Sequence, residues 1–235
     1  MFKVIISMCL ILTIATSSIA CTSCHAAVSK PVVKPAVKPK VNIQQELIKT
    51  AISYNYVRES QGDNRSPQID MFLKELGLPV GLAWCLAYIQ HCWKETCERT
   101  KTSNPMPKGV ARVSTLLKKA EMNPYVFRVK SAKSLMLGAS TAKVGDMTIH
   151  ISGVGISPKS NFNGHIEAVT KPGDDMSHLY TIGGNTGPQP KGGKKLDVEQ
   201  ERNAGGATAG VHQRYRSYAP TSNFRIEYLI EYKPA

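Results

Sequence analysis

The spacing of apolar residues changes about halfway along the chain. In the first half they recur every three or four residues, as at Ile43, Leu47 and Ala51, which is the period of an amphipathic helix. In the second half they alternate with polar residues, as in residues 224–232, which is the period of a half-buried strand. Helices followed by strands predict an α+β fold, with N-terminal helices packed on an antiparallel β-sheet.

Residues that favour helix caps and turns stand at the ends of these elements. Asn42 precedes the first helical stripe and Gln45 follows three residues later, as in a capping box. The predicted helices cover residues 42–57, 68–76, 82–97 and 111–120. The predicted strands cover residues 126–129, 147–151, 165–170, 179–182 and 224–232. The stretch 187–210 is rich in Gly, Lys and Pro, and we expect a long loop there.

The first twenty residues have the layout of a bacterial secretory signal peptide. Lys3 is followed by an apolar run over residues 4–14 and then by small residues. The apolar run is too short to span a bilayer as a helix. We therefore expect an exported protein, located in the periplasm or at the cell surface.

The end of this segment offers two processing routes. Residues 18–21 (SIAC) resemble a bacterial lipobox, although Ser18 stands where Leu is usual. Lipidation of Cys21 would make the protein a membrane-anchored lipoprotein. The alternative is ordinary signal cleavage near one of three alanines, Ala20, Ala26 or Ala27.

Residues 21–41 are a Pro/Lys-rich linker. Prolines recur every four residues with lysines between them, which favours an extended spacer. Residues 21–25 also spell C-x-x-C-H, the attachment pattern of c-type haem, with His25 as the iron ligand. The prolines and lysines that follow would not bury a haem, so a cytochrome is the least favoured alternative. The chain thus divides into a signal peptide (1–20), a linker (21–41) and one folded domain (42–235).

Charge and composition narrow the classes of partner. The formal net charge is +13, which favours an anionic partner such as nucleic acid, a membrane surface or a cell wall. Export and the lack of a recognisable reading motif argue against nucleic acid. No cluster of His, Cys, Asp or Glu has zinc spacing, so we expect no metal and no cofactor. We expect a monomer, and the pairing of Cys24, Cys92 and Cys97 stays open.

Three short strings carry candidate catalytic residues. Cys85 is expected in the first turn of an apolar helix, where backbone N–H groups and the helix dipole stabilise a thiolate. His165 is expected at the start of one strand and Asn185 near the end of the next, so antiparallel pairing can set them side by side. In such a set Cys85 attacks, His165 transfers the proton and Asn185 orients the imidazole. His150 is an alternative base, but no Gly precedes it and no paired Asn follows it, and a structural or surface role is favoured.

Together these strings resemble the CHAP domain, the cysteine, histidine-dependent amidohydrolase/peptidase family of papain-like peptidoglycan hydrolases. The resemblance covers roughly residues 48–232. The matching strings are GLAWCLAYIQHCW (81–93) for the nucleophile segment, GHIEAVT (164–170) for the histidine strand, GGNTG (183–187), VGD (144–146) and ESQGDN (59–64).

The resemblance implies a papain-like, CHAP/NlpC-type catalytic domain over residues 42–235. It assigns the roles of nucleophile, base and orienting residue to Cys85, His165 and Asn185. The chain departs from the family at Gly183, where many relatives carry Glu, at Leu86, where Ala is usual, and in a longer segment 153–163.

The expected function is an exported cysteine peptidoglycan hydrolase. It would cleave an amide of the stem peptide or the muramoyl-L-alanine link through an acyl-enzyme on Cys85. The backbone N–H of Cys85 is the expected oxyanion donor, and Gln61, Asp63 and Asn64 are candidates for a second donor. The alternative is a non-catalytic cell-wall-binding lipoprotein that retains the fold.

Overall fold

The computed structural model of the protein describes residues 41–60, 64–152, 164–173, 178–187, 209–217 and 224–234. All of them belong to one unit, Lys40–Ala235. Several predictions fall outside the described residues. These concern the signal peptide, Cys21, the C-x-x-C-H string, the linker up to residue 40, Gln61, Asp63, segment 153–163 and nearly all of the predicted loop 187–210.

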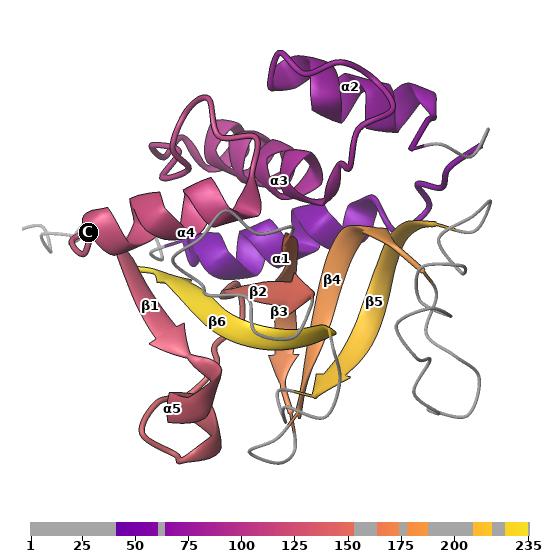
Figure 1. The fold of residues 1–235 in the computed structure, drawn as a ribbon. Coiled ribbons are helices and arrows are strands. Elements are labelled where there is room, and N and C mark those ends of the chain that lie inside the picture. Colours follow the sequence, from indigo (N-terminus) through magenta and orange to yellow (C-terminus); the bar gives the residue numbers. More distant parts are fainter. Residues whose placement is uncertain are drawn as a thin grey trace, which may run out of the picture. The chain divides into compact units, whose positions relative to one another are not determined.

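Helices fill the first half of the described chain, as predicted. They are α1 (Ile43–Ser53), α2 (Pro67–Glu75), α3 (Cys85–Thr100), α4 (Val113–Met122) and the short α5 (Ala132–Met136) (Figure 1). The predicted cap of α1 is confirmed, because the side-chain oxygen of Asn42 accepts the N–H groups of Gln44 and Gln45, both at 3.2 Å. Each predicted helix is present with shifted ends, and α5 was not predicted.

The described strands form one antiparallel sheet. They are β1 (Phe127–Ser131), β2 (Met147–Ser152), β3 (Gly164–Pro172), β4 (His178–Thr186), β5 (Gly210–Ser217) and β6 (Phe224–Tyr232). Their order across the sheet is β1-β6-β2-β3-β4-β5, so the last strand along the chain lies between β1 and β2 (Figure 1). Every neighbouring pair is antiparallel, which confirms the predicted α+β class.

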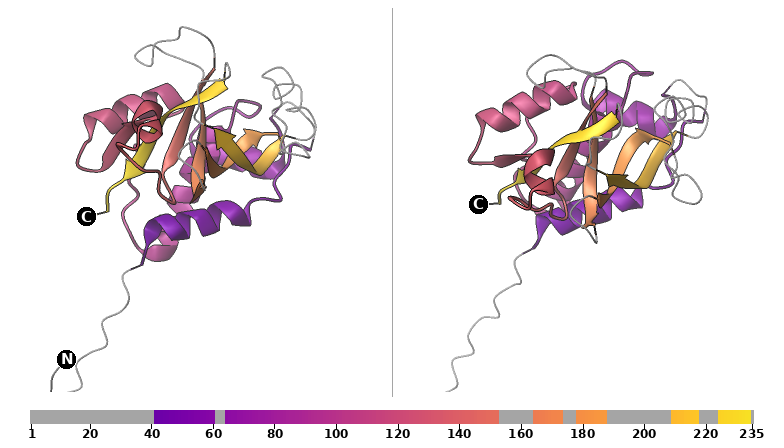
Figure 2. Two further views of the ribbon diagram at one scale, coloured as in Figure 1. Left: turned by 90° about the horizontal axis from the view of Figure 1, so that it is seen from below. Right: turned by 60° about the horizontal axis from the view of Figure 1, so that its bottom comes forward.

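Helices pack on both faces of this sheet. Helices α1 and α3 contact β3 and β4 (Figure 2). Strand residues on the face toward the main core are apolar and buried; they are Phe127, Met147, Ile149, Ile151, Ile166, Ala168, Ile182, Val211 and Ile230. On the opposite face, Leu135 of α5 packs with a smaller cluster that includes Val169 and Leu179. Alternate residues of β3 therefore enter different cores, as the period of a strand requires.

Helix α3 lies at the centre of the main core. Every residue from Cys85 to Trp93 is buried, so this helix is covered on all sides rather than on one stripe. Tyr88 donates from its hydroxyl to the carbonyl of Ala51 in α1 at 2.8 Å. The helix is thereby fixed between α1 and the sheet, and its first residue, Cys85, faces the strands.

A buried cluster of ion pairs joins strands β1 and β6 to the turn before β2. The Nζ of Lys130 lies 3.0 Å from a carboxylate oxygen of Asp146 and 3.0 Å from one of Glu231. Asp146 also accepts the backbone N–H of Lys143 at 3.0 Å. Asp146 is the last residue of the VGD string, so this motif ties β2 to β1 and β6.

Strand β5 was not predicted because its buried positions are polar. Arg214 and Arg216 point inward and are buried, whereas Gln213 and Tyr215, which alternate with them, are exposed. The alternation of a strand is present, but its inward residues are arginines, so a search for apolar residues misses it. Among the described residues, no helix is long and apolar enough to cross a bilayer.

Candidate active site

Cys85 begins α3 with its side chain against the sheet. The residue is 6% exposed, and the backbone N–H groups of Leu86 and Ile166 interact with its sulfur. Burial acts to raise the pKa of the thiol, but the hydrogen bond and positive charge of His165 outweigh it and lower the pKa of Cys85 below its ordinary value. The predicted placement of Cys85 in the first turn of a helix is therefore confirmed, and the site favours a thiolate.

The segment before Cys85 is held by a chain of hydrogen bonds. Trp84 is fully buried and donates its indole N–H to the Glu59 carboxylate at 3.2 Å. Glu59 also accepts the backbone N–H of Asn64 at 3.3 Å, and the Asn64 amide donates to the carbonyl of Gly81 at 3.3 Å. Glu59 and Asn64, the two ends of the ESQGDN string, thus support the turn that leads into α3, and the side-chain amide of Asn64 is used in doing so.

Trp84 also needs a glycine on β4. A Cβ placed on Gly184 would lie 2.4 Å from the Trp84 ring and 2.9 Å from the Cβ of Tyr88. No real Cβ tolerates such distances, so only glycine at this position lets α3 approach the sheet this closely. The second glycine of the GGNTG string is therefore explained by packing.

His165 faces Cys85 from the start of β3. Burial acts to lower the pKa of its imidazole, but the hydrogen bonds and charges of Cys85 and Glu167 raise the pKa of His165 to about 9. At neutral pH the ring is therefore protonated, beside a thiol whose pKa is lowered. The structure brings together two of the three sequence-predicted catalytic residues, from α3 and β3.

The hydrogen-bond partner described for the His165 ring is a residue that the sequence did not single out. The Nε2 of His165 lies 3.1 Å from a carboxylate oxygen of Glu167, two residues farther along β3. Glu167 is completely buried. Its carboxylate also accepts the hydroxyl of Thr181 at 2.5 Å and the Nε–H of Arg216 at 2.9 Å, with a further bond from Arg216 Nη2. Burial acts to raise the pKa of Glu167, but Arg216 and the two nearby histidines hold the pKa of this carboxyl well below its ordinary value.

His150 lies on β2 beside this pair. Its Nε2 is 2.9 Å from the Thr148 hydroxyl and 3.4 Å from Glu167. Burial lowers the pKa of His150 to about 4, although Glu167 acts to raise it. His150 is therefore neutral at pH 7 and belongs to the buried surroundings of the site, which fits a structural role and excludes a surface role.

Asn185 lies where the sequence predicted it along the chain, near the end of β4. It adopts a left-handed backbone conformation (φ 56°), and the register of β4 with β5 shifts between Gly183 and Thr186. The hydrogen bond described for the His165 ring goes to Glu167 and not to Asn185. The orienting role of Asn185 stays a prediction.

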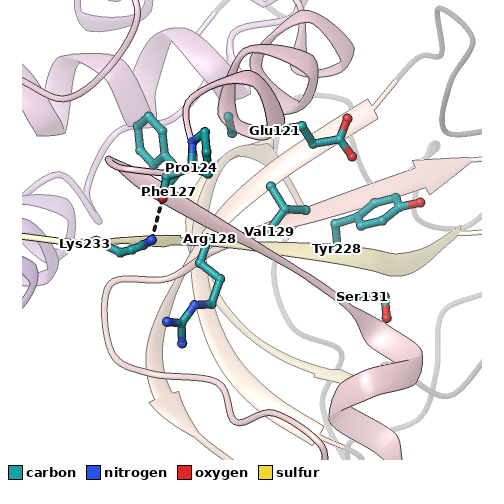
Figure 3. A pocket seen from close by; sticks show the side chains of 9 residues that line it. Glu121, Pro124, Phe127, Arg128, Val129, Ser131, Tyr228 and Lys233 are labelled. Carbon is teal, nitrogen blue, oxygen red and sulfur yellow. Dashed lines mark hydrogen bonds between the residues drawn. The ribbon is translucent and has the colours of Figure 1, made fainter.

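A separate pocket of about 570 Å³ opens between α4, β1 and β6 (Figure 3). Its walls include Glu121, Arg128 and Tyr228, and Lys233 donates to the carbonyl of Pro124 at its rim. None of the residues that line it is Cys85, His165 or Glu167. The pocket is therefore distinct from the candidate active site.

The other described cysteines differ from Cys85. Cys92 and Cys97 are buried free thiols, so they do not pair with each other, and Cys24 lies outside the described residues. Burial raises the pKa of both thiols. In the described ranges no group of three or more His, Cys, Asp or Glu side chains could hold a metal ion.

Comparison of the chain with protein-family models, with curated proteins and with solved structures found no match.

The low pKa of Cys85 predicts an unusual pH profile of alkylation. A thiol with an ordinary pKa of about 8.5 loses roughly a hundredfold in alkylation rate between pH 8 and pH 6. We expect the alkylation rate of Cys85 to fall less than this over the same range, because a lowered pKa keeps more of the thiolate present as the pH falls. The rate of iodoacetamide labelling, read by peptide mass spectrometry, measures this. The Cys85→Ala variant, which retains Cys92 and Cys97, is the control, and a profile that follows the ordinary thiol would contradict the prediction.

Proposed function

We propose that this protein is an exported cysteine amidohydrolase or peptidase of the papain-like CHAP type that acts on peptidoglycan. The observation that carries the proposal is the Cys85–His165 pair, in which a buried thiol with a lowered pKa faces an imidazole whose pKa is raised to about 9. A thiolate beside an imidazolium is the reactive form of a cysteine nucleophile.

The reaction follows from these two groups. The Cys85 thiolate attacks the amide carbonyl carbon and forms a C–S bond, while the carbonyl electrons move onto oxygen. As the C–N bond breaks, His165 gives its proton to the leaving amine. Water then attacks the thioester with His165 as the base, which releases the carboxylic acid and restores the thiolate–imidazolium pair. The backbone N–H of Cys85, at the N-terminus of α3, is the proposed donor to the oxyanion.

The substrate class rests on three sequence features. The strings around Cys85 and His165 resemble those of wall-lytic enzymes, the first twenty residues have the layout of an export signal, and the net charge of +13 suits a substrate that carries carboxylates. The bonds proposed for cleavage are amides of the stem peptide or the muramoyl-L-alanine link. Lipidation of Cys21 would hold the enzyme at the membrane beside the wall.

Digestion of purified peptidoglycan tests the proposal. Residues 28–235 and the same chain with Cys85→Ala are incubated with walls of several chemotypes, and the fragments are identified by mass spectrometry. We expect soluble fragments only from the chain that retains Cys85, and the new termini distinguish an amidase from an endopeptidase. If a folded protein releases nothing from any wall, the wall-binding alternative replaces this proposal.

A further inference from the structure

We propose that Glu167 is the positioning residue of His165, and that it performs this role from a space that Gly183 leaves open. This inference rests on the proposed function, because it assigns how the base of that reaction is oriented and kept charged. It concerns two positions on neighbouring strands, one on β3 and one on β4.

The two positions compete for one volume. Strands β3 and β4 are hydrogen-bonded neighbours, with Ala168 opposite Ile182. A Cβ placed on Gly183 would lie 2.5 Å from the Cγ of Glu167 and 3.3 Å from its carboxyl carbon. Any side chain at position 183 would therefore begin inside the space that the Glu167 side chain fills. One carboxylate fits there, and it can be supplied from either strand but not from both.

The neighbouring strands hold this carboxylate in place. Thr181 of β4 and Arg216 of β5 donate to it, and Arg216 uses both Nε and Nη2. A guanidinium that binds a carboxylate through two nitrogens fixes its plane as well as its position. Arg216 also donates to the Thr186 hydroxyl at 3.3 Å, so the guanidinium is itself anchored.

The charges in this buried row alternate. The order is thiolate of Cys85, imidazolium of His165, carboxylate of Glu167 and guanidinium of Arg216, with neutral His150 beside the carboxylate. Each buried charge thus has an opposite neighbour, which is the condition for keeping charges away from water. Because Nε2 of the protonated ring donates to Glu167, the ring plane is fixed and its other edge is directed toward the sulfur.

A carboxylate and an amide would act differently in this position. Either can orient the ring, but only the negative charge of Glu167 also stabilises the imidazolium and, through it, the Cys85 thiolate. Removal of Glu167 should therefore lower the pKa of His165 and raise the pKa of Cys85. The pH range in which thiolate and imidazolium are present together should then become narrower at both its acidic and its alkaline limit. Replacement of Asn185 should leave that range unchanged.

The test moves the carboxylate from one strand to the other. The variants are Glu167→Gln, Glu167→Ala, Gly183→Glu, the double variant Glu167→Ala/Gly183→Glu, and Asn185→Ala. Glu227→Gln, a partly exposed glutamate on β6, is the matched control. The full exported chain is used, and two quantities are measured: the pH dependence of Cys85 alkylation by iodoacetamide and the rate of peptidoglycan hydrolysis.

We expect Glu167→Gln and Glu167→Ala to slow alkylation at pH 6 by roughly tenfold or more, as loss of an adjacent opposite charge implies. Gly183→Glu alone should lose hydrolysis, because two side chains then compete for one volume. The double variant should recover alkylation at pH 6 relative to Glu167→Ala, and this recovery also shows that the site folds.

Two outcomes would overturn the inference. The first is a pH profile that Glu167→Gln leaves unchanged and Asn185→Ala shifts, which would return the orienting role to Asn185. The second is a double variant whose alkylation rate at pH 6 is no higher than that of Glu167→Ala. This would refute the claim that a carboxylate at position 183 can occupy the space of the Glu167 side chain. Alkylation needs no wall substrate, so absence of hydrolysis with an alkylation profile that depends on Glu167 would refute the proposed function and leave this inference standing.

Discussion

Replacement of His165 by alanine is expected to lower peptidoglycan hydrolysis by about two to four orders of magnitude, the range typical of a lost general acid–base. Two losses combine in this variant. The leaving amine no longer receives a proton, and the Cys85 thiolate loses the hydrogen bond and positive charge that lower its pKa. The measurement is the initial rate of amide cleavage at pH 7, with folding checked by near-UV circular dichroism.

A double variant tests whether Cys85 and His165 act as one catalytic unit or contribute independently to the rate. Groups that act as one unit are strongly non-additive, so Cys85→Ala/His165→Ala should be no slower than Cys85→Ala alone. His178→Ala is the matched control, because His178 lies on β4 of the same sheet and its ring stacks on Tyr215. A rate for His165→Ala within tenfold of the unmodified chain would show that His165 is not the base.

Replacement of Lys130 by methionine is expected to destabilise the fold by about 3–5 kcal/mol, the cost typical of leaving a buried charge without its partner. Lys130 reaches two carboxylates, those of Asp146 and Glu231, and the three side chains are almost fully buried. Methionine fills a similar volume, so the loss is electrostatic rather than a cavity. Urea unfolding measured at pH 7 gives the change in free energy.

Lys143→Met is the matched control for Lys130→Met. Lys143 binds the same Glu231 at 2.5 Å, but its side chain is 56% exposed, so solvent screens the pair and the expected cost is about 0–1 kcal/mol. The deficit of Lys130→Met should shrink as the pH falls, because protonated carboxyls no longer need the cation. Burial already raises the pKa of Asp146 despite Lys130, and protonation therefore begins early. Equal costs for the two lysines would refute this account.

The helices and most strands could be predicted because their buried sides are apolar. The stripe that begins at Ile43 and the alternation from Phe224 to Tyr232 both identify real elements, and the helix predicted over residues 82–97 is present as α3, three residues later at each end. Strand β5 could not be recognised in this way, since its inward residues include Arg214 and Arg216. Their burial is tolerated because Arg216 pairs with Glu167 and Arg214 donates to the carbonyl of Gly187 at 2.6 Å.

Some residues of the candidate site could likewise be predicted from the sequence and others could not. Cys85 and His165 stand in strings whose local setting indicates their chemistry. Glu167 stands two residues after His165, and the period of a strand places both side chains on one face, but the string does not show the residues of β4 and β5 that bind Glu167. The departure noted at Gly183 could not be explained from the sequence for the same reason. The space that this glycine leaves for the Glu167 side chain is apparent only when β3 and β4 are paired. Contacts between strands depend on register, and the register of β5 was not predictable without the strand itself.

The position of β6 within the sheet has a consequence for the order of folding. Residues 224–232 separate β1 from β2, so β1 has no strand to pair with until nearly the whole chain has been synthesised. Such long-range pairing delays folding, because the chain loses the entropy of closing a long loop before it gains any stabilising contact between the strands. Under the export proposed above, this delay would favour crossing the membrane before the sheet closes.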